Sequence, residues 1–100
     1  MNVSIIFNRK SAAWEIDNPD LNRVFVKAQM EYVKEEYRAR RYIYLEQIYT
    51  YLRIEWNPYN ENVCFIRERD GEFEFNIGYN ADYDRIVIDM FTLKRSKLRT

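Results

Sequence analysis

The sequence predicts a single α+β domain in which one long helix and one short helix pack against a small antiparallel sheet. Three patterns predict it: a helical repeat of apolar residues over about 19–40, a shorter one over about 45–54, and strand-like alternation at the N-terminus and in the last third of the chain. The chain has 100 residues, of which 47% are hydrophobic and 17% aromatic. We therefore expect residues 1–100 to form one domain with its own core.

The first predicted elements are a short strand over residues 3–7 and the long helix from about Pro19 to Arg40. Residues 11–16 either extend the strand or form a second piece. The segment Asp17-Asn-Pro-Asp20 favours a helix start, because it offers a short acceptor side chain and then a proline in the first turn. The helix carries an apolar stripe that we expect to be buried (Leu21, Val24, Phe25, Ala28, Tyr32) and a second stripe flanking it (Val26, Met30, Val33, Tyr37). A surface this wide needs a sheet or another chain to cover it.

Residues 42–44 predict an extended segment, and the apolar spacing over about 45–54 predicts the short second helix. The pair Asp70-Gly71, between residues 63–69 and 72–79, is typical of a two-residue hairpin turn of type I′. These two segments are therefore predicted to pair with each other. In that register one face is apolar and the other carries charged pairs.

The last predicted strand covers residues 86–93 and is apolar on both faces. Ile86, Ile88 and Met90 form one face, and the opposite face holds Val87, Phe91 and Leu93. A sheet with one solvated face would be polar there. Either the N-terminal strand region or a partner is expected to cover this second face.

The composition excludes several functions. The sequence has no His, one Cys and two Gly, so it offers no imidazole base, no thiolate zinc cluster and no glycine-rich phosphate loop. We expect no catalytic residues and no cofactor. The lone Cys64, the lack of a signal-peptide pattern and the lack of a long apolar span favour a cytoplasmic protein.

The carboxylates are the remaining candidates for chemistry. Asp82, Asp84 and Asp89 offer oxygen ligands for a divalent cation, but a polar loop before a strand is the simpler interpretation, so no metal site is predicted. Residues 55–93 carry a net charge of −6, from nine acids and three arginines. The predicted acidic surface, which either imitates a phosphate array or is only solvated, consists of Glu68, Asp70, Glu72, Glu74, Asp82 and Asp84.

The nine tyrosines are more than a domain of this size can bury. Tyrosine is enriched at interface hot spots, because it combines a large contact area with a hydroxyl group. Aromatic side chains beside arginine also stack single-stranded bases. We favour a protein partner because the neighbouring charge is acidic. The predicted partner-binding residues are Tyr42, Tyr44, Tyr51, Arg53, Trp56, Tyr59, Tyr79 and Tyr83.

Residues 41–91 resemble small uncharacterised proteins of bacteriophages and prophages of Gram-positive bacteria. The segment Arg41-Tyr-Ile-Tyr-Leu-Glu-Gln-Ile-Tyr-Thr-Tyr-Leu-Arg-Ile-Glu-Trp-Asn-Pro58 carries the resemblance, with Phe75-Asn-Ile-Gly-Tyr79 and Ile86-Val-Ile-Asp-Met-Phe91 in the places of the later strands. The resemblance implies an origin in a mobile element. Phages use many proteins of this size as inhibitors of host defence, including anti-CRISPR proteins, and others as assembly components.

Three hypotheses follow. The first is a non-enzymatic phage or mobile-element protein that acts in the cytoplasm of a bacterial host. It would bind and block a host protein or protein–nucleic acid complex, as an inhibitor of the anti-CRISPR type. The second is a structural or assembly protein that self-associates through its second sheet face, for example as a homodimer. The third is a nucleic-acid-binding regulator that uses Arg38, Arg40, Arg41 and the basic tail 94–100, which carries a charge of +4.

Overall fold

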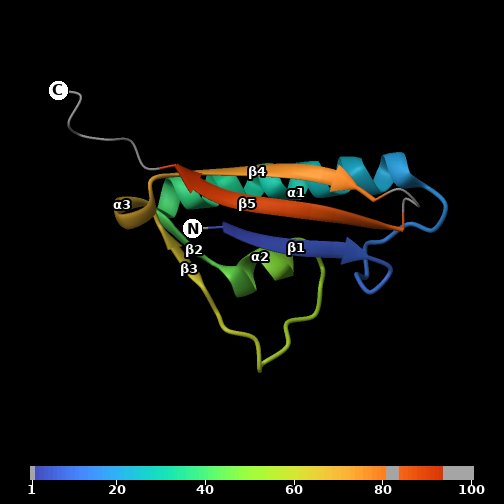
Figure 1. Cartoon of the computed structure of the whole chain (residues 1–100), viewed down its shortest axis with the longest axis horizontal. Coiled ribbons are helices and arrows are strands. Elements are labelled where there is room, and N and C mark those ends of the chain that lie inside the picture. Colours follow the sequence, from blue (N-terminus) through green and yellow to red (C-terminus); the bar gives the residue numbers. More distant parts are fainter. Residues whose placement is uncertain (1, 81–83, 94–100) are drawn as a thin grey trace.

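The computed structural model describes residues 2–80 and 84–93 and shows an α+β architecture (Figure 1). A sheet forms one layer, and the helices pack behind it. The elements follow the chain as β1 (Asn2–Asn8), α1 (Pro19–Arg40), β2 (Tyr42–Tyr44), α2 (Leu45–Tyr51), β3 (Cys64–Ile66), α3 (Arg67–Asp70), β4 (Glu72–Tyr79) and β5 (Arg85–Leu93). None of the described helices is long and apolar enough to cross a membrane.

The main sheet has three antiparallel strands in the order β1-β5-β4. Its centre is β5, where Ile88 lies opposite Ile5 on one side and Ile77 on the other. A separate two-stranded sheet pairs β2 with β3. The predicted strand at the N-terminus, the extended segment 42–44 and the last strand are thus confirmed, as is the short second helix, which ends earlier than predicted.

The predicted hairpin between residues 63–69 and 72–79 is wrong. Residues 67–70 form the helical turn α3, in which the Asp70 carboxylate accepts a hydrogen bond from the Ile66 amide at 2.8 Å. The Gly71 amide then donates to the Arg67 carbonyl at 2.8 Å. The chain therefore changes direction between two sheets, because β3 is paired with β2 and β4 with β5.

Helix α1 has the predicted bounds. The Asn18 side chain accepts from the Leu21 amide at 3.1 Å, and Arg41 closes the C-terminal end in the left-handed conformation. The choice of its buried face is a correction. The flanking stripe of Val26, Met30, Val33 and Tyr37 faces the core, whereas Leu21, Val24, Ala28 and Tyr32 of the other stripe are exposed. The stripe that packs against the sheet is the one that continues to Tyr37, at the C-terminal end of the helix.

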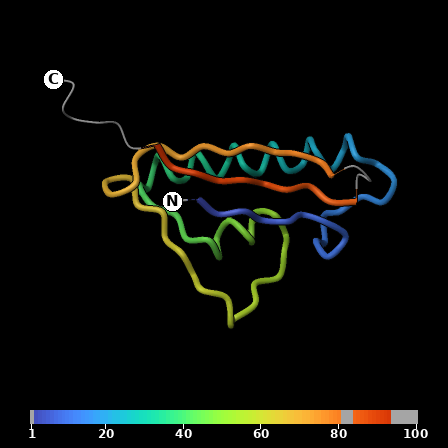
Figure 2. The backbone as a smooth tube through the Cα atoms, in the orientation of Figure 1, coloured from blue at the N-terminus to red at the C-terminus, as the bar shows by residue number. Residues whose placement is uncertain are grey.

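The core lies between the sheet and the two longer helices, and Figure 2 shows α1 running along the length of the sheet. Strands β1, β4 and β5 contribute from one side and α1 from the other, while α2 and the small sheet close the remaining part. The core residues with no exposed area are Phe7, Val26, Met30, Val33, Ile43, Ile48, Leu52, Phe65, Ile86 and Ile88.

Residues 9–18 connect β1 to α1 and are not a strand extension. The buried Ser11 hydroxyl donates to the Leu52 carbonyl at 2.8 Å, so the segment is attached to the end of α2. The buried Asn22 side chain binds both backbone groups of Glu15, at 2.8 Å each. These contacts fold the connection against the helices.

The second face of the main sheet lies in front of the helices in Figure 1. Strand β1 joins the sheet as an edge strand, so the expectation that the N-terminal strand region covers this face is not met. Ile6 and Leu93 on this face are 51% and 55% exposed. Within residues 2–80 and 84–93, no helix is packed on it.

Candidate functional site

The exposed side of β2 is the candidate binding surface. Because side chains alternate along a strand, the fully buried Ile43 points into the core while Tyr42 and Tyr44 point outward. The two tyrosines are 39% and 43% exposed, and their ring centroids lie 6.0 Å apart in an edge-to-face arrangement. Their position next to α1 and β3 makes them the wall of a hollow of about 440 Å³.

We call this hollow and its two tyrosines the Tyr42/Tyr44 surface. Pairing of β2 with β3 builds it, because Tyr42 lies opposite Ile66 and Tyr44 opposite Cys64. The Arg67 amide donates to the Arg41 carbonyl at 2.8 Å and extends this pairing. The residues around the hollow are Arg40, Arg41, Tyr42, Tyr44, Cys64, Ile66 and Glu68.

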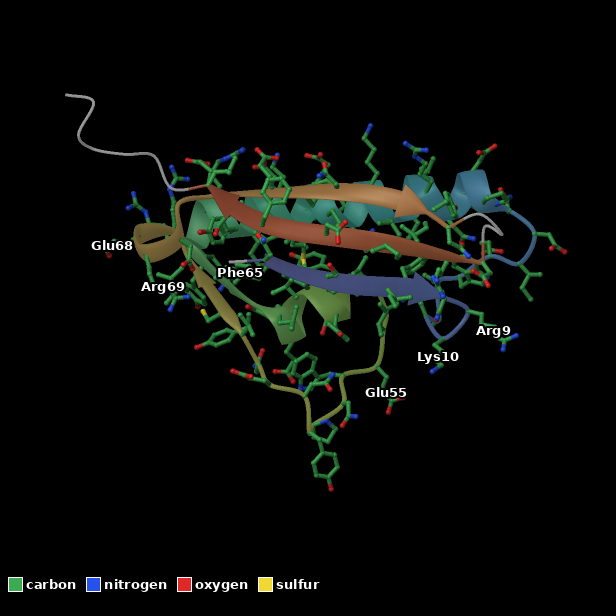
Figure 3. The ribbon with its side chains drawn as sticks, in the orientation of Figure 1. Arg9, Lys10, Glu55, Phe65, Glu68 and Arg69 are labelled. Carbon is green, nitrogen blue, oxygen red and sulfur yellow. The ribbon has the colours of Figure 1, made fainter. Side chains whose placement is uncertain are left out.

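The charges at this surface are mostly positive. Arg40 and Arg41 are exposed at the C-terminal end of α1, and neither forms an ion pair within the described residues. Arg69 donates to the Cys64 carbonyl at 2.8 Å and to the Asp70 carboxylate at 2.9 Å. Figure 3 shows Glu68 and Arg69 together at this end, with Phe65 nearer the middle of the molecule. Aromatic faces, free guanidinium groups and one carboxylate therefore share one surface.

The predicted acidic surface is not one array. Glu72 pairs with Arg67 at 2.7 Å and Glu74 with Lys34 at 3.1 Å, so these carboxylates are neutralised locally. The hydrogen bond from Arg69 lowers the pKa of Asp70.

The remaining predicted acids do not join this group. Glu68 lines the Tyr42/Tyr44 hollow, and Asp84 lines a hollow with Arg9 and Lys10. Asp82 lies outside the described residues. Figure 3 shows Arg9 and Lys10 at the opposite end of the molecule from Glu68. The sequence pattern did not predict that Glu68 and Asp84 lie at opposite ends of the molecule. Strand β4 lies between them in the chain and carries Asp84 away from α3.

Two of the predicted binding residues are held by contacts within the chain. The Tyr51 hydroxyl donates to Glu36 at 2.6 Å, and this bond raises the pKa of Tyr51. Trp56 packs edge-to-face on Tyr49 at 5.0 Å, so its indole is half-buried. Arg53 and Tyr51 line a different hollow, between α1 and α2.

The other predicted tyrosines are dispersed. Tyr59 is 94% exposed in the loop after α2. The Tyr79 hydroxyl donates to the Pro19 carbonyl at the N-terminal end of α1, and burial raises its pKa. That end is separated from Arg40 by the helix length, about 33 Å at 1.5 Å per residue. Tyr83 lies outside the described residues. The structure thus brings together Tyr42 and Tyr44 and separates them from Tyr79.

Within the described residues, Cys64 and the Asp and Glu side chains form no group of three or more that could hold a metal ion. Asp89, one of the sequence candidates, accepts a hydrogen bond from the Ser4 hydroxyl at 2.5 Å.

Comparisons with protein-family models, with curated proteins and with solved structures found no match. The geometry of the chain is therefore the basis of the functional argument. Sequence reasoning found Tyr42 and Tyr44 but missed Cys64 and Ile66, which come from β3. Cys64 and Ile66 would have been predicted as site residues if β3 had been paired with β2. The sequence analysis instead paired this segment with residues 72–79.

Proposed function

We propose that this chain is a non-enzymatic binding protein that docks a partner protein on the Tyr42/Tyr44 surface and blocks the partner by covering it. The observation that carries the proposal is the pair of half-exposed tyrosines beside a hollow. Arg40 and Arg41 lie next to it, and neither forms an ion pair within the described residues. Tyrosine and arginine are among the residues that dominate binding energy at interfaces. An apolar pocket with a charged rim is typical of such sites.

The proposed partner is a protein of a bacterial host. The resemblance of residues 41–91 to phage and prophage proteins supports this class of partner. Within it we propose a defence complex as the target, so that the chain acts as an inhibitor of the anti-CRISPR type in the host cytoplasm. The proposed mechanism is steric, because the Tyr42/Tyr44 surface offers aromatic contact area and charged groups through which the chain can cover a partner.

The test uses the wild-type chain and the double variant Tyr42→Ala/Tyr44→Ala as baits for a nuclease-treated bacterial lysate. A partner recovered with the wild type is then purified and its Kd measured by calorimetry. Truncating two hot-spot tyrosines costs at least about 2 kcal/mol, so we expect the Kd to rise about 30-fold or more.

Tyr59→Ala is the matched control, because Tyr59 is the most exposed tyrosine among the described residues and lies off this surface. It should leave the Kd unchanged. Equal loss of affinity in Tyr59→Ala and in the double variant would contradict the proposed surface. Circular dichroism checks that each variant keeps its fold.

A second candidate is single-stranded nucleic acid bound on the same surface. The specific observation is that Arg40 and Arg41, which form no ion pair in the described part of the chain, flank the tyrosine pair. Such an arrangement stacks bases and contacts phosphates. Binding to an oligonucleotide would weaken steeply with salt. Partner capture that survives nuclease treatment and high salt separates the protein partner from this candidate.

A further inference from the structure

The two edges of the main sheet differ in charge. Edge strand β4 carries Glu72 and Glu74, and Lys34 of α1 reaches Glu74 at 3.1 Å. Edge strand β1 has seven residues, Asn2–Asn8, without a charged residue, a proline or a glycine. Natural sheets protect edge strands with charges, prolines, bulges or a covering element, because an unprotected edge offers a row of free backbone groups. Edge β4 carries protecting charges, and β1 carries no charge and no proline.

The free backbone groups of β1 lie on the side away from β5. Within the described residues, the backbone of residues 2–7 forms hydrogen bonds with β5 alone. An edge strand directs about half of its N–H and C=O groups outward, where they require a partner. An extended backbone is the chemistry that matches such a row.

We propose that β1 pairs antiparallel with β1 of a second copy of this chain, about a two-fold axis at Ile5. In this register residue 3 faces residue 7 and residue 4 faces residue 6 of the second copy. The inward side chains Val3, Ile5 and Phe7 then meet only apolar side chains. Asn2 faces Asn8 at both ends, and no like charges oppose each other.

The pattern of β1 favours a second copy over an unrelated peptide. Asn2 and Asn8 lie at the two ends, and Ser4 is the one polar residue among the apolar residues between them. This pattern makes the strand complementary to itself when reversed, as a two-fold interface requires. The pairing joins two three-stranded sheets into one of six strands. It also places the half-exposed Ile6 of each copy at the seam, beside Ser4 of the other. This inference goes beyond the proposed partner binding, because it concerns a different strand.

Sedimentation velocity at rising concentration, up to about 0.1 mM, tests the pairing. The wild type should form a dimer, and Ile6→Lys should weaken the dimer at least about tenfold by placing a charge at the seam. Leu93→Lys is the matched control, since Leu93 is similarly exposed on the same sheet face but lies on the central strand. It should leave the dimer intact.

Other outcomes overturn the proposal. A wild type that stays monomeric throughout would exclude it. A dimer that survives Ile6→Lys but dissociates in Leu93→Lys would show packing of sheet faces instead. Dissociation in Val24→Lys alone would point to the exposed stripe of α1.

A spin label tests the register directly and does not depend on the charged variant folding. The label is placed at Ile6→Cys in a Cys64→Ser background. With strands about 4.8 Å apart and a rise of about 3.4 Å per residue, the two Cα6 atoms lie about 8 Å apart. Strong dipolar broadening is expected. A label at Tyr59→Cys is the control and should show none. Absence of broadening at position 6 in a dimeric sample would refute the pairing of β1.

Discussion

At the scale of single residues, a few buried polar side chains connect segments that are distant in the sequence. Tyr37, which is 2% exposed, donates from its hydroxyl to the Gly71 carbonyl at 2.6 Å and so joins the last turn of α1 to the start of β4. Its ring packs against Phe73 with centroids 5.6 Å apart. Burial, together with the nearby Asp70 carboxylate, raises the pKa of Tyr37 to about 12.

The raised pKa of Tyr37 predicts a loss of stability at high pH. An unfolded tyrosine ionises near pH 10.0, whereas folded Tyr37 keeps its proton to about 12. The contribution is therefore fully present below pH 10 and is lost as the pH rises toward 12. The shift corresponds to a loss on the order of 2 to 3 kcal/mol in the free energy of unfolding. Urea unfolding at about pH 9 and about pH 12 measures it.

Tyr37→Phe provides the comparison for this prediction. The variant should be less stable by about 1 kcal/mol at neutral pH, because the Gly71 carbonyl loses its donor. It should also lose less stability than the wild type at high pH, although Tyr51 and Tyr79 still contribute through their own raised pKa values. An equal loss of unfolding free energy at high pH in the wild type and in Tyr37→Phe would refute the role of Tyr37.

At the scale of elements, the turn between β3 and β4 decides how the chain passes from one sheet to the other. Gly71 has φ 88° and ψ −148°, a conformation that is essentially restricted to glycine. It follows the four residues of α3, whose Asp70 caps the Ile66 amide. A type I′ hairpin would have continued β3 into β4, and this glycine instead ends a helical turn.

Gly71→Ala should therefore destabilise the protein by about 1 to 3 kcal/mol, because alanine is strained in this conformation. Gly78→Ala is a matched control on β4, since a Cβ there would meet no atom within 4 Å. It should be neutral or stabilising by less than about 1 kcal/mol. Thermal unfolding of the two variants provides the measurement. Equal melting temperatures would contradict the strain at Gly71.

At the scale of the whole molecule, stability comes from the apolar core rather than from charge. The formal net charge is zero. Among the ion pairs of the described residues, Arg38 with Glu35 lies fully at the surface, with side chains 56% and 68% exposed. In two other pairs one partner is more buried, since the side chains of Lys34 and Asp70 are 20% and 10% exposed. Exposed pairs of this kind each contribute at most about 1 kcal/mol and are screened by salt.

Stability should thus depend little on salt and strongly on packing. Raising NaCl from about 0.05 M to about 1 M should change the free energy of unfolding by less than about 2 kcal/mol. Met30→Ala should lower it by about 2 to 5 kcal/mol, because Met30 is fully buried between α1 and the sheet. Urea unfolding measures both. A salt effect larger than that of Met30→Ala would show that charge dominates.

Local signals determined the elements that depend on neighbours in the chain. The Asn18 cap, Pro19 and the 3.6-residue period of apolar side chains were enough to place both ends of α1. Alternating apolar residues were enough for β1 and β5. In the candidate site, the tyrosine surplus predicted Tyr42 and Tyr44 together with six other residues and did not distinguish them from the rest. The cap, the helical period and the strand pattern each act within a few residues, and at these elements the tertiary contacts agree with them.

Only the tertiary structure decided which surfaces meet. Helix α1 has two apolar stripes, and the sheet buried the one containing Val26 and Met30 because only one stripe can face it. Segment 64–66 paired with β2 rather than β4, which brought Cys64 and Ile66 to the tyrosines and left Tyr79 at the other end. Strand pairing and burial are long-range contributions to the free energy. They outweigh a local turn preference whenever they hide more apolar surface.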